Sequence, residues 1–413
     1  TVSGVLTVGS AGDTANTTLD AGNRSWTLSG TGGNPFQILA SPQAVLTGNT
    51  STIIYNGNNG SGNTTVQSTS GYYNLSLNYV SSEDFDLGGN ITVANSLTLG
   101  QNLVAMDGAL LNTTAGNSYS ITAGSISRQT YGTLTANASI ITLTGTSGTL
   151  FQGTGTFNQG TSTVIVTSAS GTPTLLSAAT TFHKLTINAA GATVINMGAF
   201  APTINNVAGA QLYIQAGVFN ASGASITGPG GTNGTLQIDA GATLCLGGTT
   251  ASTNATCNSG ASDTTTRAMP TFQTYTFAVT STVSYLSDAA TAVSNTPIYG
   301  NLTLNPKMVT TGRAYTLGGA MTINGNLTIQ PDESGASTPA LTVNPAGDIT
   351  VASNKTTTIT RSNSATSSLD LRPSTTDYNL STGSINIATG GTLDAGSTVS
   401  SITVKGDWTK TGT

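Results

Sequence analysis

Short runs in which apolar residues alternate with Thr, Ser or Gln recur along the chain. Each run places apolar residues two positions apart, which is the pattern of a β-strand with one buried face. The i, i+3, i+4 spacing of an amphipathic helix is missing, because Gly and β-branched residues interrupt every window. The pattern predicts an all-β protein, with strands at 74–78, 96–100, 139–145, 162–168, 184–188, 235–240, 301–305 and 326–330.

The spacing between these strands is nearly constant in the first half of the chain. Equivalent apolar positions recur about every 22 residues, at Leu77, Leu99, Ile121, Leu143, Val166 and Ile187. A step of this size is expected when each repeat forms one turn of a solenoid. We therefore expect a parallel β-solenoid, or β-helix, with turns of about 22 residues and about 19 turns in all. The alternative is a series of antiparallel β-sandwiches, since Asn-Gly and Asp-Gly pairs at 56–57, 107–108, 233–234 and 324–325 could form hairpin turns.

A longer repeat overlies the short one. Runs beginning Ser-Thr-(Ile/Val) start at 51, 162 and 281, and each is followed by an aromatic residue and then by a strand of the type Asn/Lys-Leu-Ser/Thr-Leu/Ile-Asn. These starts are about 110–120 residues apart. They predict an N-terminal strand region at 1–50 and three modules at 51–161, 162–280 and 281–413.

These motifs carry a resemblance. The aromatic-x-Asn-Leu-Thr pattern, Asn-Gly-Asn-Leu-Thr-Ile at 324–329 and Gly-Asp-Trp-Thr-Lys-Thr-Gly-Thr at 406–413 are similar to bacterial extracellular β-strand-repeat surface proteins, in the style of filamentous-haemagglutinin-like adhesins. The resemblance covers most of residues 51–413. It implies a β-solenoid at the cell surface or in a fibre, and it supplies no catalytic residues.

Charge and composition exclude several classes of function. Only 7% of residues are charged and the formal net charge is -5, so no basic patch is available for nucleic acid. No apolar run reaches the ~18–20 residues of a membrane span. The chain has one histidine, His183, which we expect to be an ordinary strand residue rather than a catalytic base. With one histidine, two cysteines and two glutamates, the residue types that most often carry out catalysis are scarce, and we expect a protein that is not an enzyme.

The scarcity of charge also suits a solenoid. Stacked turns would place identical charges next to one another, whereas Thr, Ser and Asn avoid that repulsion.

Two groups of residues are candidates for covalent or metal chemistry. Cys245 and Cys257 are 12 positions apart, a spacing that suits a disulfide in an extracellular or cell-surface compartment. Glu83, Asp84 and Asp86 form the largest concentration of carboxylates. Carboxylate oxygens bind Ca²⁺, although a solvated loop is the simpler interpretation. We expect no other cofactor.

The ends of the chain suggest self-association. The sequence begins with the strand-like segment 1–8 and ends with Thr-Gly-Thr. Inside the chain, a similar Thr-Gly-Thr at 154–156 is followed by the start of the next module at 162. Because solenoid ends have strands without partners, we expect copies to join head to tail as a homopolymer. The expected contact residues are Thr1, Val2, Val5, Leu6, Trp26 and Trp408.

The sequence thus predicts a structural protein of the cell exterior, a subunit of a fibre or surface layer. The alternative is an adhesin that binds cell-surface glycans through Tyr72, Tyr73 and Tyr79. Threonines in pairs such as 142 and 144 do not keep one register over many predicted turns, which argues against an ice-binding face.

Overall fold

The structure is a computed structural model. It describes the chain except for residues 11–14, 40–43, 58, 61, 79–82, 101–107, 192, 222–223, 249–262, 310, 334–337, 397–399 and 412–413. The described residues contain strands and no helix, and the strand pairs assigned in them are parallel. The strands stack as a β-solenoid of about 14 turns. The predicted fold class is therefore confirmed, and the antiparallel sandwich alternative is wrong. No helix suited to crossing a membrane occurs in this part of the chain.

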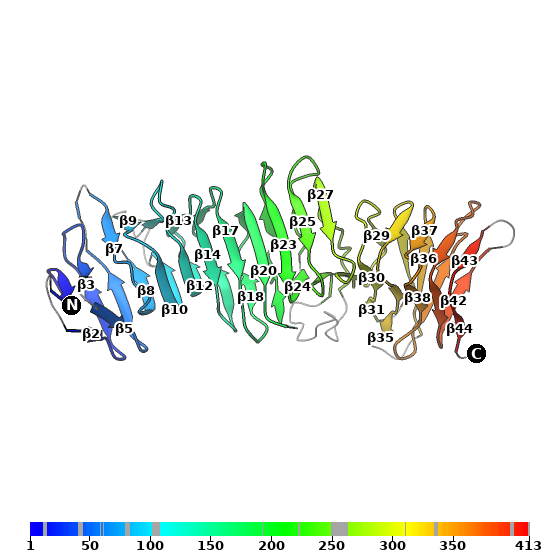
Figure 1. The fold of residues 1–413 in the computed structure, drawn as a ribbon, viewed down its shortest axis with the longest axis horizontal. Coiled ribbons are helices and arrows are strands. Elements are labelled where there is room, and N and C mark those ends of the chain that lie inside the picture. The colour runs from blue at the N-terminus through cyan, green and yellow to red at the C-terminus, as the bar shows by residue number, and fades with distance from the viewer. Residues whose placement is uncertain are drawn as a thin grey trace. The chain divides into compact units, whose positions relative to one another are not determined.

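The chain divides into two compact units, one made of residues 1–169 and 173–186 and the other of residues 170–172 and 187–413. Within each unit, strands of successive turns lie side by side, as β6, β8 and β10 do (Figure 1). The division falls inside β20 (Lys184–Asn188).

The first unit has a long sheet and a second sheet of five strands. The long sheet contains, in hydrogen-bonded order, β3 (Ser25–Leu28), β6 (Thr52–Tyr55), β8 (Tyr72–Leu77), β10 (Ile91–Leu99) and β12 (Ile121–Arg128), and then two rows, β14 (Ile140–Leu143) with β17 (Thr163–Val166) and β15 (Thr149–Gln152) with β18 (Thr174–Leu176). The second sheet contains β7 (Thr64–Val66), β9 (Glu83–Leu87), β11 (Ala109–Asn112), β13 (Thr133–Thr135) and β16 (Thr156–Asn158). Shorter elements are β1 (Leu6–Val8) paired with β4 (Phe36–Ile38), β2 (Thr17–Asp20) paired with β5 (Ala44–Thr47), and β19 (Thr180–Phe182).

The second unit is built on a long sheet and two shorter ones. Its long sheet contains β21 (Val194–Asn196), β24 (Val218–Ala221), β26 (Thr243–Leu246), β28 (Thr282–Tyr285), β30 (Asn301–Leu304), β34 (Leu327–Ile329), β38 (Thr356–Ile359), β41 (Ser384–Ile387) and β44 (Trp408–Lys410). The shorter sheets contain β29 (Thr291–Val293), β32 (Arg313–Leu317), β36 (Ala340–Pro345), β39 (Thr366–Asp370) and β42 (Gly391–Asp394), and β33 (Met321–Ile323), β37 (Ile349–Val351), β40 (Leu380–Thr382) and β43 (Ile402–Val404). The remaining strands are the row β23 (Gln211–Ala216), β25 (Thr235–Ile238) and β27 (Thr274–Phe277), the pair β31 (Lys307–Met308) and β35 (Asp332–Glu333), and β22 (Pro202–Ile204).

The register confirms some of the predicted steps and corrects others. Leu77 pairs with Leu99, and Leu143 pairs with Val166, as the predicted spacing requires. The step from Leu99 to Ile121 is wrong, because Leu99 pairs with Arg128 while Ile121 pairs with Ile91 at the other end of β10. The step from Ile121 to Leu143 is also wrong, because Ile121 pairs with Ile141 and Leu143 pairs with Ala123. Many turns are longer than predicted, so the solenoid has about 14 turns rather than about 19.

The core runs along the inside of each unit as stacked apolar side chains. In the second unit, successive strands of the long sheet stack Val283, Leu302 and Leu327, each of them fully buried. The outward residue between two core positions is Thr, Ser or Asn in most of these strands. This arrangement follows from the period-2 alternation, because neighbouring residues of a strand point to opposite faces.

The three repeat starts share one local structure. Each starting serine lies directly before a strand of a long sheet, and its N–H donates to the carbonyl of the residue three positions earlier. The pairs are Ser51 with Gly48, Ser162 with Gln159, and Ser281 with Ala278. The repeat read from the sequence thus corresponds to a repeated tight turn into β6, β17 and β28. The compact units have a different boundary, between 186 and 187.

Candidate binding faces

The residues predicted for covalent and metal chemistry are only partly described. Cys245 is fully buried on β26, and Cys257 lies outside the described residues, so the disulfide stays a prediction. On β9, Asp84 is exposed and Asp86 accepts a hydrogen bond of 2.7 Å from Asn63. The side chain of Glu83 lies outside the description. Among the described side chains, no group of three His, Cys, Asp or Glu residues is placed to hold a metal ion. The Ca²⁺ site also stays a prediction.

The predicted contact residues at the start of the chain belong to its first turn. Val2 forms a parallel bridge with Leu28 on β3, and its N–H donates to Thr27. Leu6 pairs with Phe36. Thr1 and Val5 are exposed.

The two tryptophans differ in their surroundings. Trp26 is half-buried, and its indole N–H donates to the Ala21 carbonyl at 3.1 Å. Trp408, on β44, is 53% exposed. Trp408 therefore offers a large apolar surface, whereas Trp26 is held within the first unit.

The tyrosines proposed for glycan contact have separate roles. Tyr72 is fully buried, and its hydroxyl lies 3.2 Å from the hydroxyl of Tyr55, so its ring is unavailable to a ligand. Tyr73 is half-buried and lines an uncharged hollow of about 290 Å³ together with Asn49 and Ser70. Tyr79 lies outside the described residues. Tyr72 and Tyr73 thus do not form one exposed surface.

His183 is buried in the first unit beside the fully buried Phe182. It lies between β19 and β20. The expectation that it is an ordinary residue of a strand region agrees with this burial.

Arg128 is a buried residue that sequence reasoning did not single out. It is 2% exposed, and its guanidinium lies 4.4 Å from the centre of the Phe151 ring. Nη1 donates to the Gly155 carbonyl at 2.6 Å, and Nη2 donates to the Thr180 hydroxyl at 3.2 Å. Burial lowers the pKa of Arg128 to about 10, so the guanidinium stays charged at neutral pH. Arg128 and these partners lie on three successive turns, which identifies Arg128 as a structural clamp. Arg128 continues the register position of Leu77 and Leu99 on the preceding strands, an alignment that the sequence alone does not give.

Other buried charges in the second unit are paired. Asp288 is 2% exposed and accepts a hydrogen bond of 2.8 Å from Arg313. Asp263 accepts one of 2.9 Å from Arg267. Each of these buried carboxylates therefore has its charge balanced by a cationic partner within the fold.

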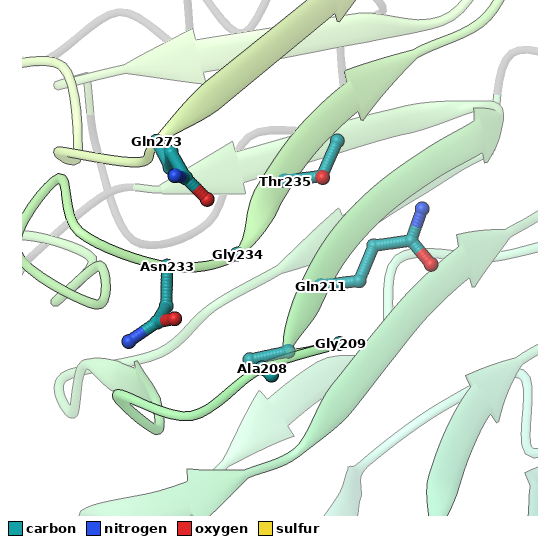
Figure 2. Close-up of a pocket in the computed structure, with 8 residues that line it drawn as sticks. Ala208, Gly209, Gln211, Asn233, Gly234, Thr235 and Gln273 are labelled. Carbon is teal, nitrogen blue, oxygen red and sulfur yellow. The ribbon is translucent and has the colours of Figure 1, made fainter.

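Two further hollows of the second unit have no charged residue in their lining. Figure 2 shows the first, with Asn233 and Gln273 on neighbouring loops and Gln211 and Thr235 on neighbouring strands. It measures about 300 Å³. The Nδ2 of Asn233 donates to Asn206, and Gln211 donates to Gln237, so part of its polar lining is already engaged.

The second hollow, which we name the hydroxyl trough, lies on the long sheet of the second unit. It also measures about 300 Å³, and its lining consists of Thr243, Thr282, Ser284, Thr303, Asn305, Thr328 and Gln330. Ser284, Thr303 and Thr328 pair with one another on β28, β30 and β34. The same register position continues outward along the sheet through Thr358, Asn386 and Thr409. The second unit therefore holds one register of uncharged polar residues over six strands, in which Ser284 and Asn386 interrupt the threonines.

The chemistry of the trough is that of hydroxyl and amide groups. Its lining includes no carboxylate, cation, imidazole or thiol, so no lining side chain could activate one of its hydroxyls as a general base. Comparison of the chain with protein-family models, curated proteins and solved structures found no match. The similarity to haemagglutinin-like surface proteins therefore stays a prediction.

Proposed function

We propose that this chain is a non-catalytic structural protein of the cell exterior, whose copies join end to end into a fibre or surface layer. The observation that supports the proposal is that, within the described residues, strands of the first and last turns pair on one side only, so each keeps a backbone edge to which a further strand can add. In the described residues, β42 pairs only with β39, β43 only with β40, and β44 only with β41. An unpaired strand edge is a template for pairing with another chain.

The first turn also presents edges. Among described pairings, β1 pairs only with β4, and β2 only with β5. The two sets of edges are different surfaces, so contact between them is heterologous and generates an open filament. Val2 pairs with Leu28 and so covers part of the edge of β3. In the junction, the first turn would therefore use the unpaired edges of β1 and β2.

Exposed apolar surface accompanies these edges. Trp408 is 53% exposed in the last turn, and Val5 is 51% exposed in the first. Burying both would add to the backbone hydrogen bonds of a junction. The low charge of the chain is also compatible with stacking, because like charges would repel across stacked strands.

The edge of β43 supplies a specific test. The N–H of Lys405 donates inward to the Thr382 carbonyl, so the N–H of the preceding Val404 points to the open edge. Val404→Pro removes that donor, whereas Val404→Ala keeps it. Sedimentation velocity and negative-stain electron microscopy should show filaments for the wild type and V404A, and loss of filaments for V404P. A wild type that stays monomeric, or V404P filaments like those of the wild type, would contradict end-to-end assembly.

A further inference from the structure

The hydroxyl trough retains hydrogen-bonding capacity that the fold does not use. The hydroxyls of Ser284, Thr303 and Thr328 make no hydrogen bond to the described part of the chain. Neighbouring positions behave differently, since Asn301 donates to Thr282 and accepts from the N–H of Asn326. Each free hydroxyl can donate one hydrogen bond and accept two.

We propose that the hydroxyl trough binds a neutral polysaccharide. An anionic ligand would need a cation, and a cationic ligand would need a carboxylate, and the lining contains neither. An apolar ligand would leave the trough hydroxyls without partners, which is costly when water is displaced. A ligand rich in hydroxyl groups and without charge matches the lining group for group.

The geometry favours an extended polymer rather than a single sugar. Parallel strands are about 4.8 Å apart, close to the length of one sugar residue in an extended β-linked chain. The register position of Ser284, Thr303 and Thr328 continues for three more strands, so six rungs extend over about 24 Å. Asn305 and Gln330 lie beside this row and add amide groups to one side of the trough.

Affinity for each sugar residue should be low, since the lining contains no aromatic ring on which a sugar could stack. Binding would instead accumulate along the row, because each successive contact is made at high effective concentration. The ligand class is therefore a long, uncharged polysaccharide, and short oligosaccharides should bind much more weakly.

Native-gel affinity electrophoresis tests this proposal on the whole chain at concentrations where it is monomeric. The gels would contain soluble mixed-linkage β-glucan or galactomannan, with alginate as the anionic comparison. The test variant is Thr303→Val with Thr328→Val, which removes two hydroxyls and keeps the shape of the strands. The control is Thr322→Val with Thr350→Val, an adjacent, exposed threonine pair on β33 and β37.

The wild type and the control should be retarded by a neutral polysaccharide, and T303V/T328V should bind about tenfold more weakly. Alginate should not retard any of them. Absence of retardation of the wild type by both neutral polysaccharides, retention of full binding by T303V/T328V, or equal loss in the control would overturn the proposal. Thermal unfolding of each variant would establish that the fold is intact.

Discussion

The hydroxyl groups of Tyr55 and Tyr72 lie 3.2 Å apart in the buried interior of the first unit, and Tyr285 and Tyr299 repeat this contact at 3.2 Å in the second. In both units the pair also bonds to one loop residue. Gln67 donates its N–H to Tyr55 and accepts from Tyr72, and Ser294 does the same with Tyr285 and Tyr299. The pair thus joins two neighbouring turns and fixes the loop between them.

Removing one hydroxyl should leave buried polar groups without partners. Tyr55→Phe deprives the Gln67 N–H of its acceptor and should lower the free energy of unfolding by about 1–3 kcal/mol. Tyr73→Phe is the matched control, because Tyr73 is half-buried and outside the pair. Urea unfolding followed by circular dichroism would measure both. Equal stabilities for Y55F and Y73F would show that the hydroxyl contact contributes nothing.

The tyrosine pairs should also make the protein sensitive to alkaline pH. Burial raises the pKa of Tyr55 and of Tyr285 to about 12, from the ordinary value of 10.0. Between pH 10 and 12 the unfolded chain loses these protons while the folded chain keeps them. The contribution of these two tyrosines to the free energy of unfolding is therefore constant below pH 10 and falls above it. Melting temperatures between pH 8 and 11.5 should fall less steeply for Tyr55→Phe with Tyr285→Phe than for the wild type. Parallel curves would contradict burial of these hydroxyls.

Arg128 should be important for stability, although no acidic residue in the described part of the chain pairs with it. Arg128→Met removes the donors for the Gly155 carbonyl and the Thr180 hydroxyl, which remain buried. The free energy of unfolding should fall by about 3 kcal/mol. The Arg128→Lys variant should also be less stable than the wild type, because one ammonium group cannot replace the several coplanar N–H donors of a guanidinium. Arg24 is exposed, so Arg24→Met is a suitable control with little expected effect. The melting temperatures of the three variants would test this prediction. Equal melting temperatures for R128M and R24M would contradict a stabilising role for Arg128.

Close stacking of turns should make Gly153 irreplaceable. Its φ is +91°, and a β-carbon there would lie 1.8 Å from the Arg128 carbonyl oxygen. Gly241 has a similar φ of +78° but open space around the added carbon. Gly241→Ala should therefore cost about 1–2 kcal/mol from backbone strain alone, and Gly153→Ala substantially more. Comparable melting temperatures for G153A and G241A would show that the turns can move apart without cost.

The fold class was readable from the sequence because side-chain alternation has a local cause. In β30, Leu302 and Leu304 flank Thr303, and the structure buries both leucines and turns the threonine outward. The number of turns was less readable. Ile121 follows Leu99 at the predicted spacing but pairs with Ile91, because β10 is a long strand whose two ends are equally apolar.

The candidate sites depended on register, which the sequence did not specify. The row of uncharged polar residues that passes through Ser284, Thr328 and Thr409 becomes visible only when strands of unequal spacing are aligned by their hydrogen bonds. Arg128 was missed for the same reason, since its partners Gly155 and Thr180 are distant along the chain. Isolated sequence motifs gave no sign that these residues meet.

The pairing of β25 with β27 shows that a turn of the solenoid can contain many more residues than its neighbour. Thr235 lies opposite Gln211 on one side and opposite Thr274 on the other, and the chain segment that leads to Thr274 is much the longer of the two. Backbone alignment is thus preserved when one coil contains far more amino acids than its neighbour. A foreign epitope exchanged into the longer coil should leave adjacent coils intact, making the protein a usable scaffold for peptide display.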